Sequence, residues 1–196
     1  MAGPSLYAPS LSAPSLIVID VQMDFADRAA AGRAFANPGA VAVIADLLAA
    51  FRARDLPVIH VHHHDLPPDS PMHADAPGAA VQPQAAPLPG EPVYVKHVNS
   101  AFIGTSLEAD LRAAGRTDLI LVGGAANYCV ETTARMAGNL GFATTVVADA
   151  LICMGQTGID GRRFPPADVL AMTLANLDGE FARVVTAAAL LAELPA

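Results

Sequence analysis

Three ionisable side chains, those of Asp20, Lys96 and Cys129, follow three separate apolar runs of the sequence. If these runs are strands of one parallel sheet, their carboxyl ends meet at the same edge and the three side chains can converge. A carboxylate in an apolar site has a raised pKa and can remove a thiol proton, and a neighbouring ammonium favours the thiolate. The three residue types therefore predict attack of the Cys129 thiolate on a carbonyl carbon.

Cys129 lies in the most suggestive stretch of the chain, Asp118 to Gly141, which is DLILVGGAANYCVETTARMAGNLG. The apolar run from Leu119 to Val122 is followed by two glycines and then by a helical pattern that starts near Tyr128. The first turn of a helix presents unpaired backbone N–H groups and the positive end of the helix dipole, and both favour a thiolate. The turn before Cys129 also offers N–H donors for an oxyanion.

Each of the three residues also has a structural explanation. A cysteine at a strand–helix junction can be a packed core residue, an aspartate after a strand can cap a turn, and a lysine at a strand end can be solvated. These alternatives stay open, and only the coincidence of all three residues favours catalysis. The glycines at 123 and 124 lack the GxGxxG spacing of a dinucleotide site, and we expect no cofactor.

The elements that must position these residues alternate between strand and helix. Apolar runs predict six strands, at 16–20, 57–61, 93–95, 119–122, 143–148 and 181–186, and helical patterns predict helices at 38–54, 107–114, 128–140, 166–177 and 187–194. This alternation predicts an α/β fold with three α/β/α layers, in which a Rossmann-like, mostly parallel six-stranded sheet carries helices on both faces. Gln22, Asp24 and Phe25 are expected on a loop. The Pro-, Ala- and Gly-rich segment 66–92 is expected to be a lid or an oligomer contact.

Length and composition limit the classes of partner. The 196 residues predict a single domain at 15–196, after a flexible leader at 1–14. No window holds about 18 uninterrupted apolar residues, so no membrane partner is expected, and the net charge of −8 argues against nucleic acid. Hydrophobic residues reach 53%, which favours a homo-oligomer, a dimer or tetramer, that hides apolar surface. Only two cysteines occur, Cys129 and Cys153, which is no disulfide framework and fits a cytoplasmic location.

Three segments, LIVIDVQMDF, VKHVNSAFIGT and GGAANYCVETTARMAGNLGF, resemble the isochorismatase-like cysteine hydrolase superfamily, and the resemblance covers residues 15–190. Members of that superfamily act on small amides and related C–N bonds, including those of nicotinamide, N-carbamoyl compounds, ureido compounds and lactams. The resemblance implies Asp20 as general base, Lys96 as its charged partner and Cys129 as the nucleophile of an acyl-enzyme. It also implies a cis peptide bond between Gly124 and Ala125, which aims the N–H groups of Ala125 and Cys129 at the oxyanion.

Four residues are candidates for substrate contacts. Phe25 is the best candidate for an aromatic wall over the substrate, and Asn99 and Phe102, just past Lys96, are similarly placed. Tyr128 can shape the pocket as well. The aromatic residues among these candidates could equally be packing residues.

The histidines after the second strand raise the question of a metal. Relatives with nicotinamidase activity carry a metal set of Asp and His just after that strand. This chain has five residues of those types nearby without the same spacing, namely His62, His63, His64, Asp65 and His73. We therefore expect no dedicated metal, and a surface or pocket-lining cluster instead.

The predicted function is a cysteine-dependent amidohydrolase that cleaves the C–N bond of a small amide, ureido or lactam substrate. A first alternative is hydrolysis of a vinyl ether, but the true isochorismatases that catalyse it lack the nucleophilic cysteine, so Cys129 argues for amide chemistry. A second alternative is a non-catalytic α/β binding protein in which the three residues are structural.

Overall fold

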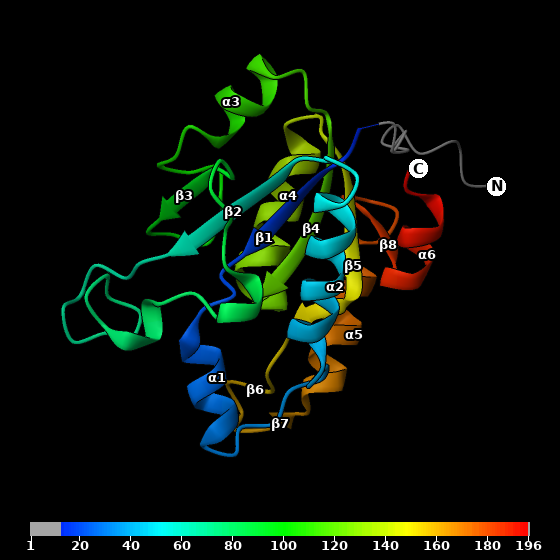
Figure 1. Ribbon diagram of the computed structural model, residues 1–196. Coiled ribbons are helices and arrows are strands. Elements are labelled where there is room, and N and C mark those ends of the chain that lie inside the picture. The colour runs from blue at the N-terminus through cyan, green and yellow to red at the C-terminus, as the bar shows by residue number, and fades with distance from the viewer. Residues whose placement is uncertain (1–12, 196) are drawn as a thin grey trace.

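The computed structural model describes residues 13–195, which form a six-stranded sheet between layers of helices (Figure 1). The strand order is β3-β2-β1-β4-β5-β8, and all neighbouring pairs are parallel. The strands are β1 (Ser15–Ile19), β2 (Val58–His63), β3 (Val93–Lys96), β4 (Asp118–Gly124), β5 (Ala143–Ile152) and β8 (Arg183–Val185). The predicted fold class is confirmed.

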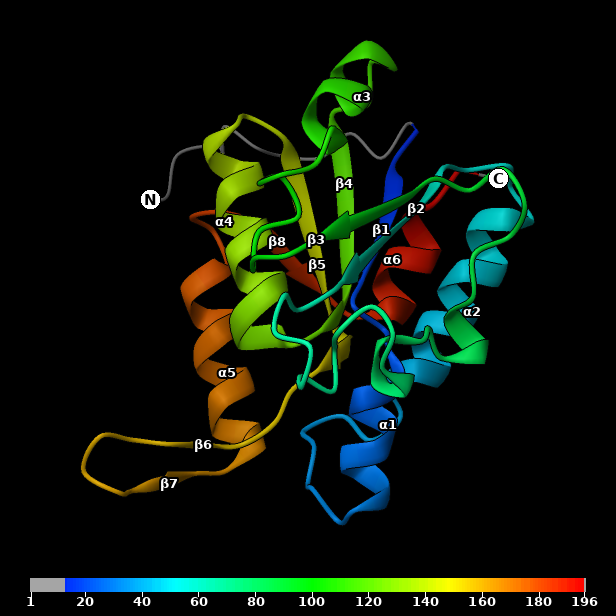
Figure 2. The same cartoon turned by 90° about the vertical axis from the view of Figure 1, so that its left-hand side faces the viewer.

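Helices cover both faces of this sheet. They are α2 (Ala40–Arg52), α3 (Leu107–Ala113), α4 (Glu131–Asn139), α5 (Pro166–Leu177) and α6 (Ala187–Glu193), whereas α1 (Met23–Ala30) lies beyond the carboxyl ends of the strands (Figure 1). Figure 2 shows α4 and α5 on one side of the sheet and α2 and α6 on the other. Within residues 13–195, no helix is long and apolar enough to cross a membrane.

β1 runs through the middle of the core, and all its residues are buried. Leu16 and Val18 join the apolar cluster beneath α2 and α6, whereas Ile17 and Ile19 join the cluster beneath α3, α4 and α5. Because alternate side chains of a strand point to opposite faces, a strand covered on both faces needs a continuous apolar run. Burial of each such side chain contributes about 1.5 to 3 kcal/mol. The strand end that leads into Asp20 is therefore firmly held.

The chain builds the sheet outward in two directions from its centre. β1, β2 and β3 follow one another towards one edge, and β4, β5 and β8 follow one another towards the other. The strand order therefore reverses between β1 and β4. The crevice at the carboxyl ends of two such strands is the usual place for a ligand in an open α/β sheet.

Three segments differ from the sequence-based expectations. Residues 23–30 form α1, so Asp24 and Phe25 lie on a helix and not on a loop. This helix has only eight residues, too few for its periodicity to be recognised in the sequence. The stretch 151–165, for which the sequence predicted no strand or helix, contains a hairpin of β6 (Gln156–Thr157) and β7 (Arg163–Phe164). The helix expected from Tyr128 begins as a π-helical turn, Ala126–Val130, before α4.

The predicted leader falls almost wholly on residues 1–12, which lie outside the described residues.

Gly123 allows β4 to approach β1 closely. It pairs with Ile19 and has a φ of 114°, and a Cβ atom there would lie 2.0 Å from the carbonyl oxygen of Ile19. Gly123→Ala is therefore expected to push the two strands apart beside Asp20 and to lower the free energy of unfolding by about 3 kcal/mol or more. Urea unfolding measures this change.

Gly141 supplies the matched control for that measurement. Its φ is also positive, at 84°, but nothing lies within 4 Å of a Cβ atom built there. Gly141→Ala should then cost only the left-handed backbone penalty of about 1 to 2 kcal/mol. Equal losses in the two variants would contradict the role of close strand approach.

Candidate active site

Asp20, Lys96 and Cys129 meet at the carboxyl edge of the sheet. Asp20 follows β1, Lys96 is the last residue of β3, and Cys129 lies in the π-helical turn after β4. Lys96 Nζ is 2.7 Å from Asp20 Oδ2 and 3.2 Å from Cys129 Sγ. The structure thus brings together the three residues that the sequence singled out.

The backbone at Asp20 helps to place its carboxylate. Asp20 has a φ of 52°, in the left-handed region that aspartate tolerates better than most residues. This conformation ends the extended run of β1 at the crevice between β1 and β4. One carboxylate oxygen, Oδ2, accepts a hydrogen bond from Lys96, and the other, Oδ1, is buried with no hydrogen-bond partner among the described residues. An unpaired buried oxygen is available to take a proton.

All three side chains are largely removed from water. Asp20 is 2% exposed, Lys96 1% and Cys129 9%. Burial raises the pKa of the Asp20 carboxyl, and the adjacent Lys96 ammonium opposes that shift. A carboxyl group with a raised pKa is suited to act first as a base and then as an acid.

The pKa of the Cys129 thiol is subject to effects that the sequence-based expectation did not include. Burial, and next the negative charge of Asp20, raise the pKa of the Cys129 thiol to about 12, although Lys96 acts in the opposite direction. Burial and the nearby carboxylate thus act on the thiol pKa in the opposite direction to the helix terminus and the Lys96 ammonium. A thiol whose pKa is raised in this way needs a base to take its proton before the sulfur can attack.

His63, the last residue of β2, is a fourth member of the cluster. Its Nδ1 atom is 3.0 Å from Lys96 Nζ, and its Nε2 atom is 2.7 Å from Asp65 Oδ1. Sequence reasoning placed His63 only in a histidine-rich cluster. The parallel register that pairs His63 with Lys96 would have identified it, but the sequence does not reveal strand register.

The potential metal ligands in this cluster already surround a cation. Asp20, His63 and Cys129 offer ligand atoms that lie within 4.8 Å of one another. The Lys96 ammonium contacts all three side chains, at 2.7, 3.0 and 3.2 Å. A metal ion among these atoms would meet that positive charge at close range, so the donor set does not fit a metal while Lys96 is charged.

The neighbouring histidines, His62 and His64, make their contacts outside this cluster. His62 lies next to the His60 ring, 6.4 Å between centroids, and burial lowers the pKa of His62 to about 4. The backbone carbonyl of His64 accepts a hydrogen bond from His97 Nδ1 at 2.7 Å. Because alternate strand residues point to opposite faces, the run His62–His64 does not converge on one point.

A cavity of about 540 Å³ opens in front of Cys129. Phe25, Asn99 and Tyr128 line it together with Ala125, as the sequence suggested. Phe102 does not line the cavity. Its ring is 7% exposed and stacks on Phe142 with 5.7 Å between centroids, because the segment after Lys96 turns back into the core. Phe102 is therefore a packing residue and not a substrate contact.

Several other residues of the cavity carry no recognisable sequence signal. The ion pair of Asp24 and Arg28, 2.7 Å long, lines it from α1, and Met72 and Asp65 line it from the segment after β2. His97 lines the cavity as well. The charges around the nucleophile are thus largely paired with one another.

Gln22 ties segment 66–92 to the site. Its side-chain amide accepts a hydrogen bond from the His63 backbone N–H at 2.8 Å and donates to the His63 and Ala79 carbonyls at 2.9 and 2.7 Å. Gln82 in turn donates from Nε2 to the Gln22 carbonyl at 2.9 Å. Part of the segment predicted to be a lid or an oligomer contact is therefore anchored against the end of β1.

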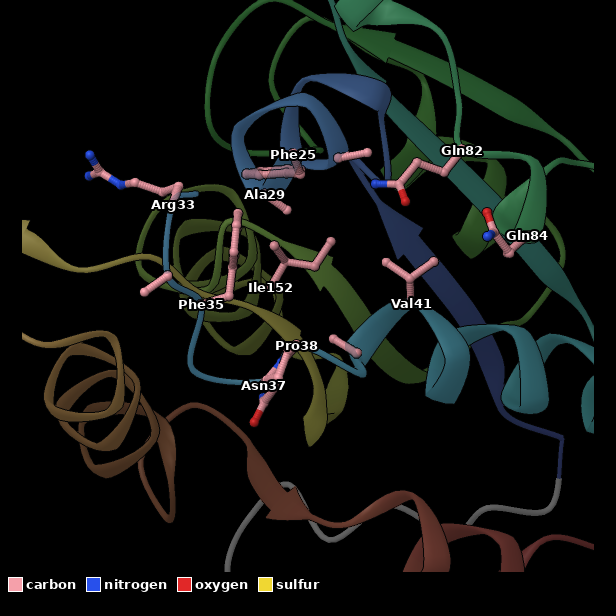
Figure 3. A pocket seen from close by; sticks show the side chains of 13 residues that line it. Phe25, Ala29, Arg33, Phe35, Asn37, Pro38, Val41, Gln82, Gln84 and Ile152 are labelled. Atoms are coloured by element: carbon pink, nitrogen blue, oxygen red, sulfur yellow. The ribbon is translucent and has the colours of Figure 1, made fainter. Parts of the chain in front are cut away.

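A second cavity, of about 600 Å³, lies between α1 and the start of α2 (Figure 3). Phe35, Val41 and Ile152 give it apolar walls, and Arg33 and Gln84 lie at its periphery. Phe25 lines both cavities and so forms a partition between them. Gly124 leaves room for this ring, since a Cβ atom there would lie 2.8 Å from Phe25 Cε2.

The peptide bond between Gly124 and Ala125 is cis, as the family resemblance implies. Ala125 and Cys129 both border the first cavity.

The second cysteine, Cys153, is buried, and burial raises the pKa of its thiol to about 11. Cys153 is a residue of the apolar core.

Comparison with known proteins assigns the chain to a family. A family model described as the isochorismatase domain matches residues 14–189. The chain belongs to the isochorismatase family. Its recognisable segments and its fold agree with that assignment, and members of the family are hydrolases that include amidohydrolases.

Individual relatives of this isochorismatase-family protein match most of its length. The uncharacterized isochorismatase family protein YrdC of Bacillus subtilis is 34% identical over 172 residues, which cover 88% of this chain and 91% of that protein. The maleamate amidohydrolase of Pseudomonas putida is 30% identical over 190 residues, which cover 88% of this chain and 83% of that enzyme. The crystal structure of an isochorismatase-family protein from Chromobacterium violaceum is 43% identical, covers 98% of both chains and gives a TM-score of 0.90.

Proposed function

We propose that this isochorismatase-family protein hydrolyses the C–N bond of a small amide, ureido compound or lactam through a thioester on Cys129. The observation that carries the proposal is the buried contact of Lys96 with both Asp20 and Cys129 at the edge of a cavity. A nucleophile, a base and a fixed positive charge are the groups that acyl transfer requires. The similarity to a maleamate amidohydrolase supports the choice of a C–N bond.

The acylation half-reaction begins with proton transfer. Asp20 takes the proton of Cys129 Sγ while Sγ forms a bond to the substrate carbonyl carbon, and the carbonyl π electrons move to oxygen. The backbone N–H groups of Ala125 and Cys129 stabilise that oxyanion. Collapse of the tetrahedral intermediate breaks the C–N bond, and the Asp20 carboxylic acid gives its proton to the departing nitrogen.

Deacylation repeats the proton transfers with water as the nucleophile. Asp20 removes a proton from water as the oxygen adds to the thioester carbon. The second tetrahedral intermediate then breaks its C–S bond, and Cys129 recovers the proton from Asp20. Lys96 keeps its charge throughout and stabilises the anionic partner of each step, whether this is the carboxylate or the thiolate.

Ammonia or amine release from a panel of amides, ureido compounds and lactams tests this function directly. The expected result is turnover of at least one C–N substrate, together with an acyl adduct on Cys129 in the intact mass spectrum of protein quenched during turnover. Hydrolysis of a vinyl ether that survives complete alkylation of Cys129 would support the non-covalent alternative instead.

The partition formed by Phe25 leads to a prediction about substrate size. Phe25→Ala joins the cavities of about 540 and 600 Å³. The kcat/KM ratio between amides with a large apolar substituent and amides with a small one is expected to rise about tenfold, because more apolar surface can be buried. Phe35→Ala is the control, since Phe35 lines only the second cavity. An equal change of selectivity in both variants would argue against the partition.

A further inference from the structure

The Lys96 ammonium has three hydrogens and contacts three candidate acceptors. Besides Asp20 Oδ2 and Cys129 Sγ, the third contact is His63 Nδ1 at 3.0 Å. A lysine ammonium can only donate, so in these contacts His63 Nδ1 must carry a lone pair and no hydrogen. The three acceptors then satisfy every hydrogen of a charge that is 1% exposed.

The other nitrogen of the same ring is fixed by a carboxylate. His63 Nε2 lies 2.7 Å from Asp65 Oδ1 and must carry the remaining hydrogen of a neutral imidazole. Asp65 is held in turn, since Ser70 Oγ donates to its Oδ2 at 2.5 Å and its backbone N–H donates to the Met72 carbonyl at 3.0 Å. The hydrogen bond from Ser70 leads the effects that lower the pKa of Asp65, so this carboxylate stays charged.

The backbone of His63 is fixed independently of its ring. Gln22 binds both the N–H and the carbonyl of His63, at 2.8 and 2.9 Å. Gln22 therefore fixes the backbone of His63. Asp65 binds the Nε2 atom of its ring, and Lys96 binds the Nδ1 atom. A side chain used only for packing would not need both nitrogens oriented.

We propose that His63 is a positioning residue which, with Asp65, holds the Lys96 ammonium in place against Asp20 and Cys129. Its meaning for catalysis rests on the proposed function, but the hydrogen-bond arrangement does not. Without the Nδ1 acceptor, a buried ammonium hydrogen would be left unsatisfied. Lys96 would then turn away or lose its proton, and either change removes positive charge from the neighbourhood of Cys129 Sγ.

Other charged groups at the cavity do not replace this contact. Arg28 is committed to Asp24 at 2.7 Å, and His97 Nδ1 is committed to the His64 carbonyl at 2.7 Å. Asp20 already accepts one of the three Lys96 hydrogens. Substitution of His63 is therefore the direct test of what orients the Lys96 ammonium.

The tautomer of His63 can be observed in the free protein. Long-range ¹H–¹⁵N NMR at pH 8 is expected to show hydrogen on Nε2 and none on Nδ1. In the double variant Asp65→Ala/Lys96→Met, both tautomers should be populated, because neither of the two groups that select one of them remains. Hydrogen on Nδ1 in the wild-type protein, or an unchanged single tautomer in the double variant, would overturn the proposed arrangement.

The reactivity of Cys129 reports the effect on the nucleophile. Alkylation by iodoacetamide at pH 9, followed by mass spectrometry of the Cys129 peptide, is expected to be about tenfold slower or more in His63→Leu, since each unit of thiol pKa changes the thiolate fraction tenfold. His63→Asn should retain most of the wild-type rate, because its amide oxygen can replace Nδ1 as acceptor. A wild-type rate in His63→Leu, or no rescue by His63→Asn, would refute the positioning role.

His73→Leu is the matched control, as His73 lies in the segment after β2 that also carries Asp65, but does not line the cavity. It is expected to keep the wild-type alkylation rate. If His63→Leu does not fold, as judged by circular dichroism, the tautomer of the wild-type protein still decides the question. Neither measurement uses a substrate, so failure of all amides in the panel would refute the proposed function without touching this inference.

Discussion

Cys129→Ala is expected to abolish amide hydrolysis while the fold survives. The thiol is the nucleophile of the proposed reaction, and removal of a covalent nucleophile lowers kcat by about 10⁴-fold or more. The structural cost is small by comparison. Cys129 contributes one sulfur atom to the edge of an apolar cluster, and its loss should lower the free energy of unfolding by about 1 kcal/mol.

Product release and intact mass together check this prediction. Wild-type protein quenched during turnover should carry an acyl group on Cys129, and Cys129→Ala should release no product above background. Cys153→Ala is the control, since Cys153 is a buried core thiol outside both cavities. Turnover by Cys129→Ala at the wild-type rate would eliminate the thioester mechanism.

The sequence predicted the centre of the site because its residues are tied to the strongest local signals. β1 and β4 are buried on both faces, so each shows as an uninterrupted apolar run with a clear end. Parallel strands share a direction, so Asp20, Lys96 and Cys129 could be assigned to one edge without knowledge of the strand order. That assignment needed no side-chain geometry.

The residues that surround the centre depend on information that a single sequence lacks. His63 became recognisable only through its register with Lys96, because a shift by one residue would have turned its side chain to the other face. Phe102 was misplaced because the chain turns into the core three residues after Asn99. The sequence-based argument for a thiolate rested on the helix terminus, which the sequence reveals, and omitted burial, which depends on packing.

Asp20→Asn is expected to make Cys129 more reactive and yet slow the enzyme. Burial and, next, the negative charge of Asp20 raise the pKa of the Cys129 thiol to about 12. Asparagine removes the charge while Lys96 stays beside the sulfur, so the pKa should fall and alkylation by iodoacetamide at pH 8 should be faster. Asparagine cannot carry the proton to the departing nitrogen, so kcat/KM should fall by about 10² to 10⁴-fold.

Lys96→Met is expected to change the reactivity of Cys129 in the opposite direction. It removes the charge that lowers the Cys129 pKa and leaves the Asp20 carboxylate that raises it, so alkylation should be slower than in the wild-type protein. Both variants should lose turnover, but their alkylation rates should move in opposite directions. Rapid and complete acylation of Asp20→Asn by substrate would show that Asp20 is not the base. Slower alkylation of Asp20→Asn would instead show that the carboxylate does not hold the thiol protonated, and the account of the resting site would then fail.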